Sequence, residues 1–572
     1  MRRVIVVVAL MRLFGRRLSK SRIFWALARK KGLAFKNMKY CGVLLANFLA
    51  WGCILQLCAG ENEGEKILNV RDFGAIGDGR EHPVREWIQS GRYSSIQVLR
   101  KAAPFITNDH WSVDEAAFEL AKRALPPEGG AVYFPTGTYV ATARAWMILR
   151  DHLRLIGDGP GKTILTTGTN VLDGLVLAGY RHTGWSRGYP FSSGDGAQGT
   201  DVLALREPDA AARFRVGQLV FVRNGANRYD QDYGEVNEVR SVTDDGRVRL
   251  THPLARDYTL DQLNWAGKTV VGCLMPRVDG AVRMAFAQGP DFFLPSRGDV
   301  ISVGENIFRV ESATEPAFVR LVNVGRANAA AGSPIAPGTL VAKERGLVIM
   351  AETTRGFRCE KLTVRGRRKA LTLSNSFDTA FEDCVIERQP GDGRVDGGIV
   401  LDGDDGRYAR FVRCEIRANP PCGMQFARSF GSVAFEECHF IDTNVAFTEF
   451  NFDCAVTRCS FDIVGGGALK NAIIVGKSCD DIRVAGNTIK ARDLATIFDA
   501  RTDIQSFHRR GRGAVVLRDN IIETSAVGRI FDLESAVAPL VMGNTVSGQY
   551  AVLGAEEVES QPSTESVGTH TH

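Results

Sequence analysis

The first 60 residues lack acidic side chains altogether. They contain 12 of the 71 Lys and Arg residues of this 572-residue chain and no Asp or Glu, so they account for its formal net charge of +6. Without them, 59 basic residues face 65 acidic ones, which gives a net charge of −6. Because proteins that bind nucleic acids need a basic surface for the phosphate backbone, the charge of residues 61–572 argues against such a partner.

This basic segment is typical of a targeting signal. Residues 2–36 are rich in Arg and Lys, and an uncharged stretch at 41–59 follows and ends in small residues, as a cleavage site does. We predict that residues 1–60 direct the chain to the periplasm or out of the cell, with Met38 as an alternative start. In the other interpretation, residues 41–59 stay uncleaved as a membrane anchor, because their length is sufficient to cross a bilayer.

Cysteine is scarce, and leucine-rich repeats are absent. Twelve Cys residues in 572 are too few for a disulfide scaffold. The Leu-x-x-Leu-x-Leu pattern that marks leucine-rich repeats does not occur where the chain repeats. These absences leave the repeats described next without a disulfide framework and outside the leucine-rich class.

Eight segments from residue 359 on share one pattern, in which an apolar residue lies two places after a fixed position. The segments are CEKLTV (359–364), FEDCVI (381–386), FVRCEI (411–416), FEECHF (435–440), VTRCSF (456–461), VAGNTI (484–489), LRDNII (517–522) and VMGNTV (541–546). The fixed positions hold Leu362, Cys384, Cys414, Cys438, Cys459, Asn487, Asn520 and Asn544. Successive fixed positions are 21 to 33 residues apart. Repeats of this length indicate a solenoid, in which each unit buries its apolar side against its neighbours.

The repeats consist of strands. Short β-branched or aromatic runs bounded by Gly, Asp, Asn and Ser alternate with the eight segments, and they are too short for helices. The predicted fold is all-β, a right-handed parallel β-helix. Its repeat position would form a column of buried, unpaired Cys followed by Asn residues that hydrogen-bond from coil to coil, about 4.8 Å apart.

The N-terminal part of the chain predicts a cap for this solenoid. Ser112 is a good helix N-cap and Glu115 completes a capping box, ahead of an apolar stripe over 116–124. Such a helix would cover the first coil, whose edge is otherwise exposed. Strand and turn patterns lie on both sides, in ILNVRDFGAIGDG (67–79), GGAVYFPTGTY (129–139) and LRLIGDGPGKTIL (153–165).

These motifs, with the Asp-Glu-Ala-Ala of 114–117 between them, resemble the N-terminal signature of the pectate lyase superfamily. More narrowly, residues 67–178 are similar to polygalacturonase-related and rhamnogalacturonase/epimerase-like proteins. The resemblance implies a β-helix that acts on polysaccharides. It does not select a reaction, because the superfamily includes hydrolases, lyases, epimerases and phage tailspikes.

Residues 180–345 interrupt the coils with a duplication. VRSVTDDGRVRL (239–250) and VESATEPAFVRL (310–321) have equal length, and a Gly-led strand precedes each of them. We predict two small inserted β modules, serving as a structural elaboration or as a substrate or subunit contact. The predicted organisation is a targeting segment at 1–60, cap and first coils at 61–179, inserted modules at 180–345, coils at 346–556 and a disordered tail at 557–572.

The polygalacturonase motifs are largely missing. The chain has Gly403-Asp404-Asp405-Gly406 in place of the Asp-Asp pair of these enzymes, but it lacks their Gly-His-Gly and Arg-Ile-Lys. A carboxylate pair still suits acid/base chemistry. The resemblance thus implies a polysaccharide partner and leaves lyase, hydrolase and epimerase chemistry open.

Candidate site residues follow from the coil spacing. Asp402 points outward from its strand, and steps of 26, 21 and 28 residues lead from it to polar residues on the following coils. The candidate catalytic residues are Asp402, Asp404, Asp405 and Arg428, and the candidate substrate-binding residues are Gln425, Glu449, Lys477 and Arg501. The same stripe could instead be a salt-bridge ladder that keeps the surface soluble.

The function predicted from the sequence is an exported protein that cleaves or modifies an acidic, uronate-containing polysaccharide. The alternative is a non-catalytic β-helix that binds glycans or builds a surface structure. No resident cofactor or metal site is required, although an Asp cluster can hold Ca²⁺ through oxygen ligands. A membrane contact is expected only through an uncleaved 41–59. The sequence determines neither the sugar nor the oligomeric state.

Overall fold

Each coil of the chain contributes strands to three parallel sheets, which together enclose one apolar core. The computed structural model describes residues 65–552 with gaps. The residues outside the description are 1–64, 107–110, 144, 149, 170, 172, 179–187, 191–196, 205–213, 215, 218, 225–233, 244, 257–268, 273–279, 284–299, 304–305, 316–317, 324–349, 352–353, 375, 390–398, 405, 428–429, 449, 467–468, 477, 501–513, 534–538 and 553–572.

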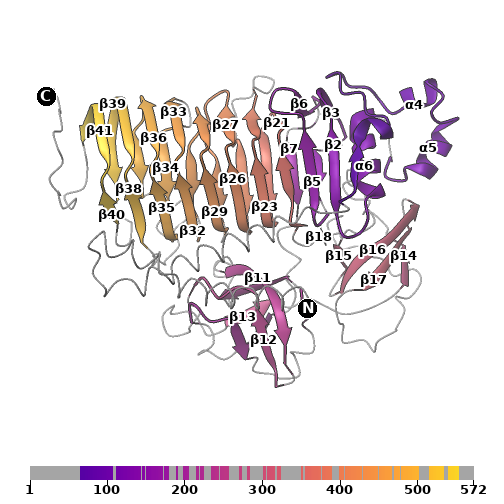
Figure 1. Cartoon of the computed structure of the whole chain (residues 1–572), viewed down its shortest axis with the longest axis horizontal. Coiled ribbons are helices and arrows are strands. Elements are labelled where there is room, and N and C mark those ends of the chain that lie inside the picture. Colours follow the sequence, from indigo (N-terminus) through magenta and orange to yellow (C-terminus); the bar gives the residue numbers. More distant parts are fainter. Residues whose placement is uncertain are drawn as a thin grey trace, which may run out of the picture. The chain divides into compact units, whose positions relative to one another are not determined.

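The strands form three ladders that follow the order of the sequence (Figure 1). Sheet 1 contains β1 (Ile67–Asn69), β2 (Gly130–Phe134), β5 (Leu153–Gly157), β20 (Arg358–Glu360), β23 (Ser376–Glu382), β26 (Arg407–Val412), β29 (Gly431–Glu436), β32 (Phe452–Thr457), β35 (Asp480–Ala485), β38 (Val515–Arg518) and β40 (Leu540–Met542), with β19 (Thr354–Arg355) beside β23. Sheet 2 contains β3 (Gly137–Ala141), β6 (Thr163–Thr167), β21 (Thr363–Gly366), β24 (Val385–Arg388), β27 (Glu415–Ala418), β30 (His439–Ile441), β33 (Ser460–Val464), β36 (Thr488–Arg492) and the first parts of β39 (Ile521–Asp532) and β41 (Thr545–Val552). Sheet 3 contains β4 (Trp146–Ile148), β7 (Asp173–Ala178), β22 (Lys369–Ser374), β25 (Leu401–Asp404), β28 (Gln425–Ala427), β31 (Val445–Phe447), β34 (Asn471–Val475), β37 (Thr496–Asp499) and the remaining parts of β39 and β41.

Identical side chains stack from coil to coil in the core. Phe381, Phe411 and Phe435 occupy one register position of sheet 1, and their ring centroids lie 5.0 and 4.7 Å apart. Side chains alternate between the core and the surface along each strand, so neighbouring coils bury the same register positions. The predicted right-handed parallel β-helix with a capping helix and inserted β modules is confirmed.

The repeat position lies at the turn between sheets 1 and 2 and forms the buried column that the sequence predicts. Cys384, Cys414, Cys438 and Cys459 are buried there and form no disulfide. Burial raises the pKa of the Cys384 thiol, which makes it an unreactive core group.

An Asn ladder continues this column. The Asn487 amide donates to Oδ1 of Asn520 at 2.9 Å, and the Asn520 amide donates to Oδ1 of Asn544 at 2.8 Å. Each turn also needs one left-handed residue directly before the column. These residues are Lys361, Asp383, Arg413, Glu437, Arg458, Gly486, Asp519 and Gly543, with φ between 50° and 67°. The predicted hydrogen-bonded ladder is therefore confirmed.

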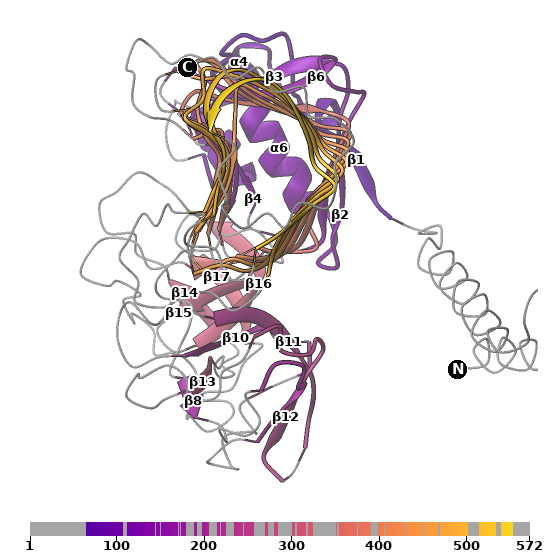
Figure 2. The same ribbon diagram turned by 90° about the vertical axis from the view of Figure 1, so that its left-hand side faces the viewer.

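Helix α6 (Val113–Ala124) lies across the first coil (Figure 2). Ser112 caps it by accepting a hydrogen bond from the Glu115 amide at 3.1 Å. The Glu115 carboxylate reaches to the end of β3, where it accepts from the amides of Thr142 and Ala143 at 2.9 and 2.8 Å. It thus ties the helix to the coil, a role that the capping-box interpretation did not include. The shorter helical segments are η2 (Val70–Phe73), α4 (Glu86–Gln89) and α5 (Ile96–Ala102).

Asp114 explains why the motifs of the N-terminal signature occur together. Its carboxylate accepts hydrogen bonds from the amides of Ile76, Gly77 and Val140, at 2.7, 3.1 and 3.1 Å. Gly77 has a φ of 71°, and a Cβ there would lie 2.7 Å from the ring of Tyr139. Burial raises the pKa of Asp114, and the three amide donors oppose that rise. The Asp-Glu-Ala-Ala motif therefore clamps the glycine turn onto β3.

Two antiparallel sheets are inserted between β7 and β19. The first contains β8 (Gly188–Pro190), β9 (Val202–Ala204), β10 (Leu219–Asn224), β11 (Gly234–Val242), β12 (Arg247–Leu250) and β13 (Thr269–Gly272). The second contains β14 (Gly280–Arg283), β15 (Val300–Val303), β16 (Asn306–Glu315), β17 (Phe318–Asn323) and β18 (Met350–Ala351). The expected boundary at 345 lies outside the described residues.

The duplicated segments adopt the same local structure. β10, β11 and β12 form an antiparallel meander, as do β15, β16 and β17. In both meanders, the register between the middle strand and the third strand shifts at equivalent positions. The shift lies between Val239 and Ser241 in β11 and between Val310 and Ser312 in β16. The duplicated segments thus share one bulge position, and β16 has a second bulge between Ala313 and Glu315.

The first inserted sheet packs on the outer side of sheet 1 through buried ion pairs. Nη1 of Arg407, on β26, lies 2.8 Å from Oε1 of Glu235, on β11, with exposed fractions of 4% and 0%. Nε of Arg256 lies 3.3 Å from Oδ2 of Asp480, on β35. The ring centroids of His252 and Tyr408 lie 4.9 Å apart, and burial lowers the pKa of His252. These contacts fix the insertion to the coils.

Candidate functional site

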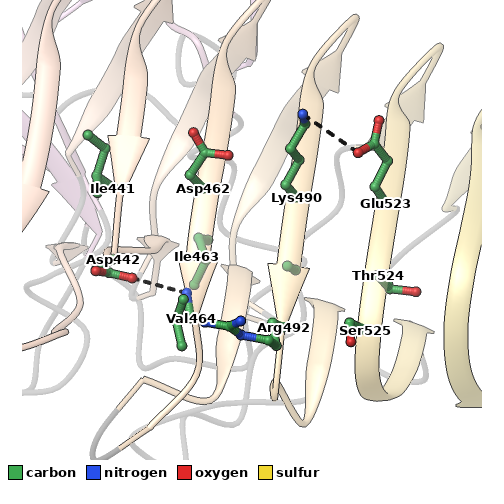
Figure 3. Close-up of a pocket in the computed structure, with 11 residues that line it drawn as sticks. Ile441, Asp442, Asp462, Ile463, Val464, Lys490, Arg492, Glu523, Thr524 and Ser525 are labelled. Carbon is green, nitrogen blue, oxygen red and sulfur yellow. Dashed lines mark hydrogen bonds and ion pairs between the residues drawn. The ribbon is translucent and has the colours of Figure 1, made fainter.

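A groove of about 450 Å³ crosses the outer face of sheet 2. It extends over four coils, from the end of β30 across β33 and β36 to β39 (Figure 3). Its lining residues are Ile441, Asp442, Asp462, Ile463, Val464, Lys490, Ala491, Arg492, Glu523, Thr524 and Ser525. The volume is within the usual range of ligand pockets.

The central row of the groove alternates in charge. Ile441, Asp462, Lys490 and Glu523 are register partners on successive strands and lie in one row in Figure 3. Nζ of Lys490 lies 3.7 Å from Oε2 of Glu523, and both side chains are more than half exposed. Both side chains are therefore already accessible to a ligand.

Residues beside the row complete the groove. Arg492 lies two residues after Lys490 on the same strand, so both cations are on the same face. The Asp442 carboxylate accepts a hydrogen bond from the Val464 amide at 3.0 Å, and Nε2 of His439 lies 2.9 Å from Oδ2 of Asp462. The side of the groove toward β30 is thus built by acidic groups held in fixed positions.

Earlier coils use the same row differently. Arg365, Glu387 and Arg417 precede Ile441 in register, and both guanidinium groups hydrogen-bond to the Glu387 carboxylate. That carboxylate is only 3% exposed. Charges in coils with β21, β24 and β27 are therefore paired closely with one another, whereas Lys490 and Glu523 in the groove lie 3.7 Å apart and are both exposed.

The sequence-predicted stripe lies on sheet 3 and is described only in part. Asp402 and Gln425 are register partners, and the Gln425 amide donates to Oδ1 of Asp402 at 3.1 Å. Nζ of Lys369, which the sequence reasoning missed, forms an ion pair with Oδ2 of Asp402. The pair is mostly buried, with exposed fractions of 21% for Lys369 and 18% for Asp402.

The other predicted site residues cannot be placed with Asp402. Asp404 ends β25, and only its backbone is described. The residues outside the described part of the chain are Asp405, Arg428, Glu449, Lys477 and Arg501. Their assignment to the site stays a prediction.

The groove residues that the prediction missed follow a simple rule. Asp462, Lys490 and Glu523 each lie three residues after the Cys or Asn of the repeat position. That offset places a side chain on the outer face of sheet 2 in every repeat, so the eight segments themselves carried the signal.

Neither a metal cluster nor a membrane-spanning helix is seen in the described residues. No group of three or more His, Cys, Asp or Glu side chains is arranged there to hold a metal ion. None of the helices in the described part of the chain combines the length and the apolarity that a membrane crossing requires. The predicted anchor at 41–59 lies outside that part.

No protein-family model and no curated protein matches this chain. The solved structures to which it is similar at low identity include the following three. The tailspike protein gp49 from Pseudomonas phage LKA1 is 12% identical with a TM-score of 0.34, over 85% of this chain and 81% of that chain. The A-module of the mannuronan C-5 epimerase AlgE4 of Azotobacter vinelandii is 11% identical with a TM-score of 0.30, over 86% and 98%. DFA-IIIase from Arthrobacter chlorophenolicus A6 is 11% identical with a TM-score of 0.34, over 86% and 88%. Similarity at this level establishes neither a family nor a function for this chain.

Proposed function

We propose that this protein is an exported β-helix of the pectate lyase superfamily that binds a polysaccharide along the groove of sheet 2. The observation that carries the proposal is the row of exposed polar side chains at Asp462, Lys490 and Glu523, one on each successive coil. A linear polymer that lies along the solenoid axis would meet one such group about every 4.8 Å. The sequence signature at 67–178 supports the superfamily assignment.

The groove is better suited to binding than to catalysis. A general acid that acts near neutral pH needs a carboxyl group whose pKa is raised, usually by an apolar pocket. Asp462 and Glu523 are 54% and 52% exposed, so water solvates both. Exposed carboxylates are good acceptors for sugar hydroxyls, which favours binding as the role of this surface.

Cleavage at the predicted stripe is the second candidate function. Asp402 is favoured for it because it is mostly buried and because Lys369 and Gln425 both contact its carboxylate. A carboxylate held in this way can act as a general base, in a hydrolase or in a lyase. Incubation with a panel of uronate polysaccharides distinguishes the two reactions, since a lyase leaves an unsaturated, ultraviolet-absorbing uronate and a hydrolase yields only reducing ends.

Blocking the groove should weaken polysaccharide binding. Ser525 is an exposed residue that lines it, and Ser525→Trp is expected to weaken polysaccharide binding at least tenfold, because the indole would occupy the ligand's space. Affinity electrophoresis in gels that contain each polysaccharide of the panel measures this loss. Arg483→Trp places the same indole on the exposed face of β35 in sheet 1 and should change nothing. Equal binding by both variants would refute the groove as the binding site.

Export is proposed on the sequence of residues 1–60. We expect a mature protein that begins near residue 61, because the uncharged stretch at 41–59 ends in small residues. N-terminal sequencing of protein from the periplasm or the medium tests this. An intact 41–59 in the membrane fraction would support the anchor instead, and an intact N-terminus on a cytoplasmic protein would refute both.

A further inference from the structure

The order of charges along the groove indicates which class of glycan the groove would bind. Along the axis the described side chains present Asp462 on β33, then Lys490 and Arg492 on β36, then Glu523 on β39 (Figure 3). Among the side chains that line the groove, the cations of β36 therefore lie between a carboxylate on β33 and another on β39. Adjacent coils are about 4.8 Å apart, so a ligand meets these changes of sign within a few sugar units.

The two cations keep hydrogen-bonding capacity for a ligand. Nζ of Lys490 is 3.7 Å from Glu523, and Nε of Arg492 is 3.7 Å from Oδ2 of Asp493. These distances are those of ion pairs and are too long for good hydrogen bonds. By contrast, Nε of Arg417 donates to Glu387 at 2.7 Å on an earlier coil of the same sheet. A carboxylate or sulfate opposite β36 would gain the short, charge-assisted hydrogen bonds that Lys490 and Arg492 do not form with their neighbours.

The flanking carboxylates exclude further anions. A negative group on the next unit along the polymer would face Asp462 or Glu523 across about one coil. At about 5 Å in water, the repulsion between two like charges weakens binding about fourfold, and by more where the ligand excludes water. A neutral unit in the same place offers hydroxyl groups that these carboxylates accept.

We propose that the groove selects a heteropolysaccharide in which an acidic sugar is flanked by neutral sugars, rather than a homopolymer of uronate. The inference rests on the proposed function, since it assigns a ligand class to the same groove. Lys490 and Arg492 bind the acidic unit, and Asp462 and Glu523 bind the hydroxyl groups of its neutral neighbours. The specificity comes from repulsion of adjacent acidic units by the carboxylates as much as from attraction of one acidic unit by the cations.

Three polymers test this in direct binding assays at one ionic strength: hyaluronan, in which uronate alternates with a neutral sugar, polygalacturonate and neutral dextran. The protein is expected to bind hyaluronan at least tenfold more tightly than polygalacturonate. Lys490→Gln with Arg492→Gln should weaken hyaluronan binding at least tenfold. Asp462→Asn with Glu523→Gln should strengthen polygalacturonate binding and so reduce the preference for hyaluronan over polygalacturonate. Arg483→Gln, a charge change on the same coil but on sheet 1, is the control and should alter none of these values.

The outcomes separate this inference from the proposed function. Equal binding of polygalacturonate and hyaluronan, with loss of both in Ser525→Trp, would overturn the charge selection and leave the groove as the binding site. Unchanged polygalacturonate binding in the Asp462→Asn and Glu523→Gln double variant would also overturn it. Binding that survives Ser525→Trp, or no binding to any of the three polymers, would overturn both proposals.

Discussion

Replacing Arg407 with Met is expected to make the backbone amides of β11 exchange with solvent about 10²–10⁴-fold faster. The change removes the guanidinium from Glu235, which is fully buried, and leaves a carboxylate in the interface between the inserted sheet and sheet 1. Breaking a buried ion pair by removing one partner costs about 3–5 kcal/mol, which corresponds to this factor. Hydrogen exchange read by mass spectrometry measures it locally, and a local measurement is required because long repeat proteins do not unfold in one step.

The same strand supplies the control. Arg410 is also on β26 and also pairs with a Glu, but its side chain is 57% exposed and its bonds to Glu436 are 3.1 and 3.2 Å long. Arg410→Met should therefore cost less than about 1 kcal/mol. Adding Glu235→Met to Arg407→Met should recover much of the lost protection, because it removes the buried carboxylate that has lost its guanidinium partner. If Arg407→Met and Arg410→Met behaved alike, the buried pair would not be what holds the insertion.

The repeat was readable from the sequence because its signals are local. The Cys and Asn column reports a turn whose geometry is set within a few residues, by one left-handed position and the buried residue after it. The Asn487–Asn520 hydrogen bond joins residues 33 apart, yet the regular coil makes the pairing predictable. The capping helix was predictable for the same reason, from a cap and an apolar stripe.

The site was harder to predict because two kinds of position had to be distinguished. Residues that follow the strands of sheet 3, such as Arg428 or Lys477, are separated by connections of different length, so their alignment across coils cannot be derived from sequence spacing. Positions on sheet 2 keep a constant offset from the repeat position, which makes Asp462, Lys490 and Glu523 the better-defined row. The sequence reasoning followed the Asp-Asp motif instead of this offset.

Contacts of the insertion had no local signal. Arg407 and Glu235 are 172 residues apart, and Arg256 and Asp480 are 224 apart. Their residue types are common and their spacing follows no period. Only the three-dimensional arrangement shows that these charges are buried and paired, so this part of the fold could not be derived from one sequence.

If the protein cleaves its polysaccharide, Asp402→Asn is expected to lower turnover about 10²–10⁴-fold, the usual contribution of a general acid or base. The amide keeps the shape of the side chain and its place beside Gln425, but it cannot accept a proton. Lys369 and Asp402 keep about a fifth of their surface exposed, so loss of their ion pair should cost less than the about 3–5 kcal/mol of a fully buried pair, and the variant should fold. Initial rates on the most rapidly degraded polysaccharide, with thermal unfolding of both proteins, separate turnover from stability.

Asp383→Asn is the matched control for Asp402→Asn. Asp383 lies on the same coil and pairs with Arg413 at 2.7 Å, but at the turn between sheets 1 and 2, so its loss should leave turnover unchanged.

Asp404→Asn and Arg428→Ala test the rest of the predicted site and should lower turnover in the same way. Full turnover in Asp402→Asn and in these two variants would place the chemistry elsewhere on the coils. A parent protein that binds the polysaccharide but degrades none of the panel would show that Lys369, Asp402 and Gln425 are a structural ladder. The function would then be binding alone, because the exposed carboxylates of the groove lack the environment that a catalytic acid needs.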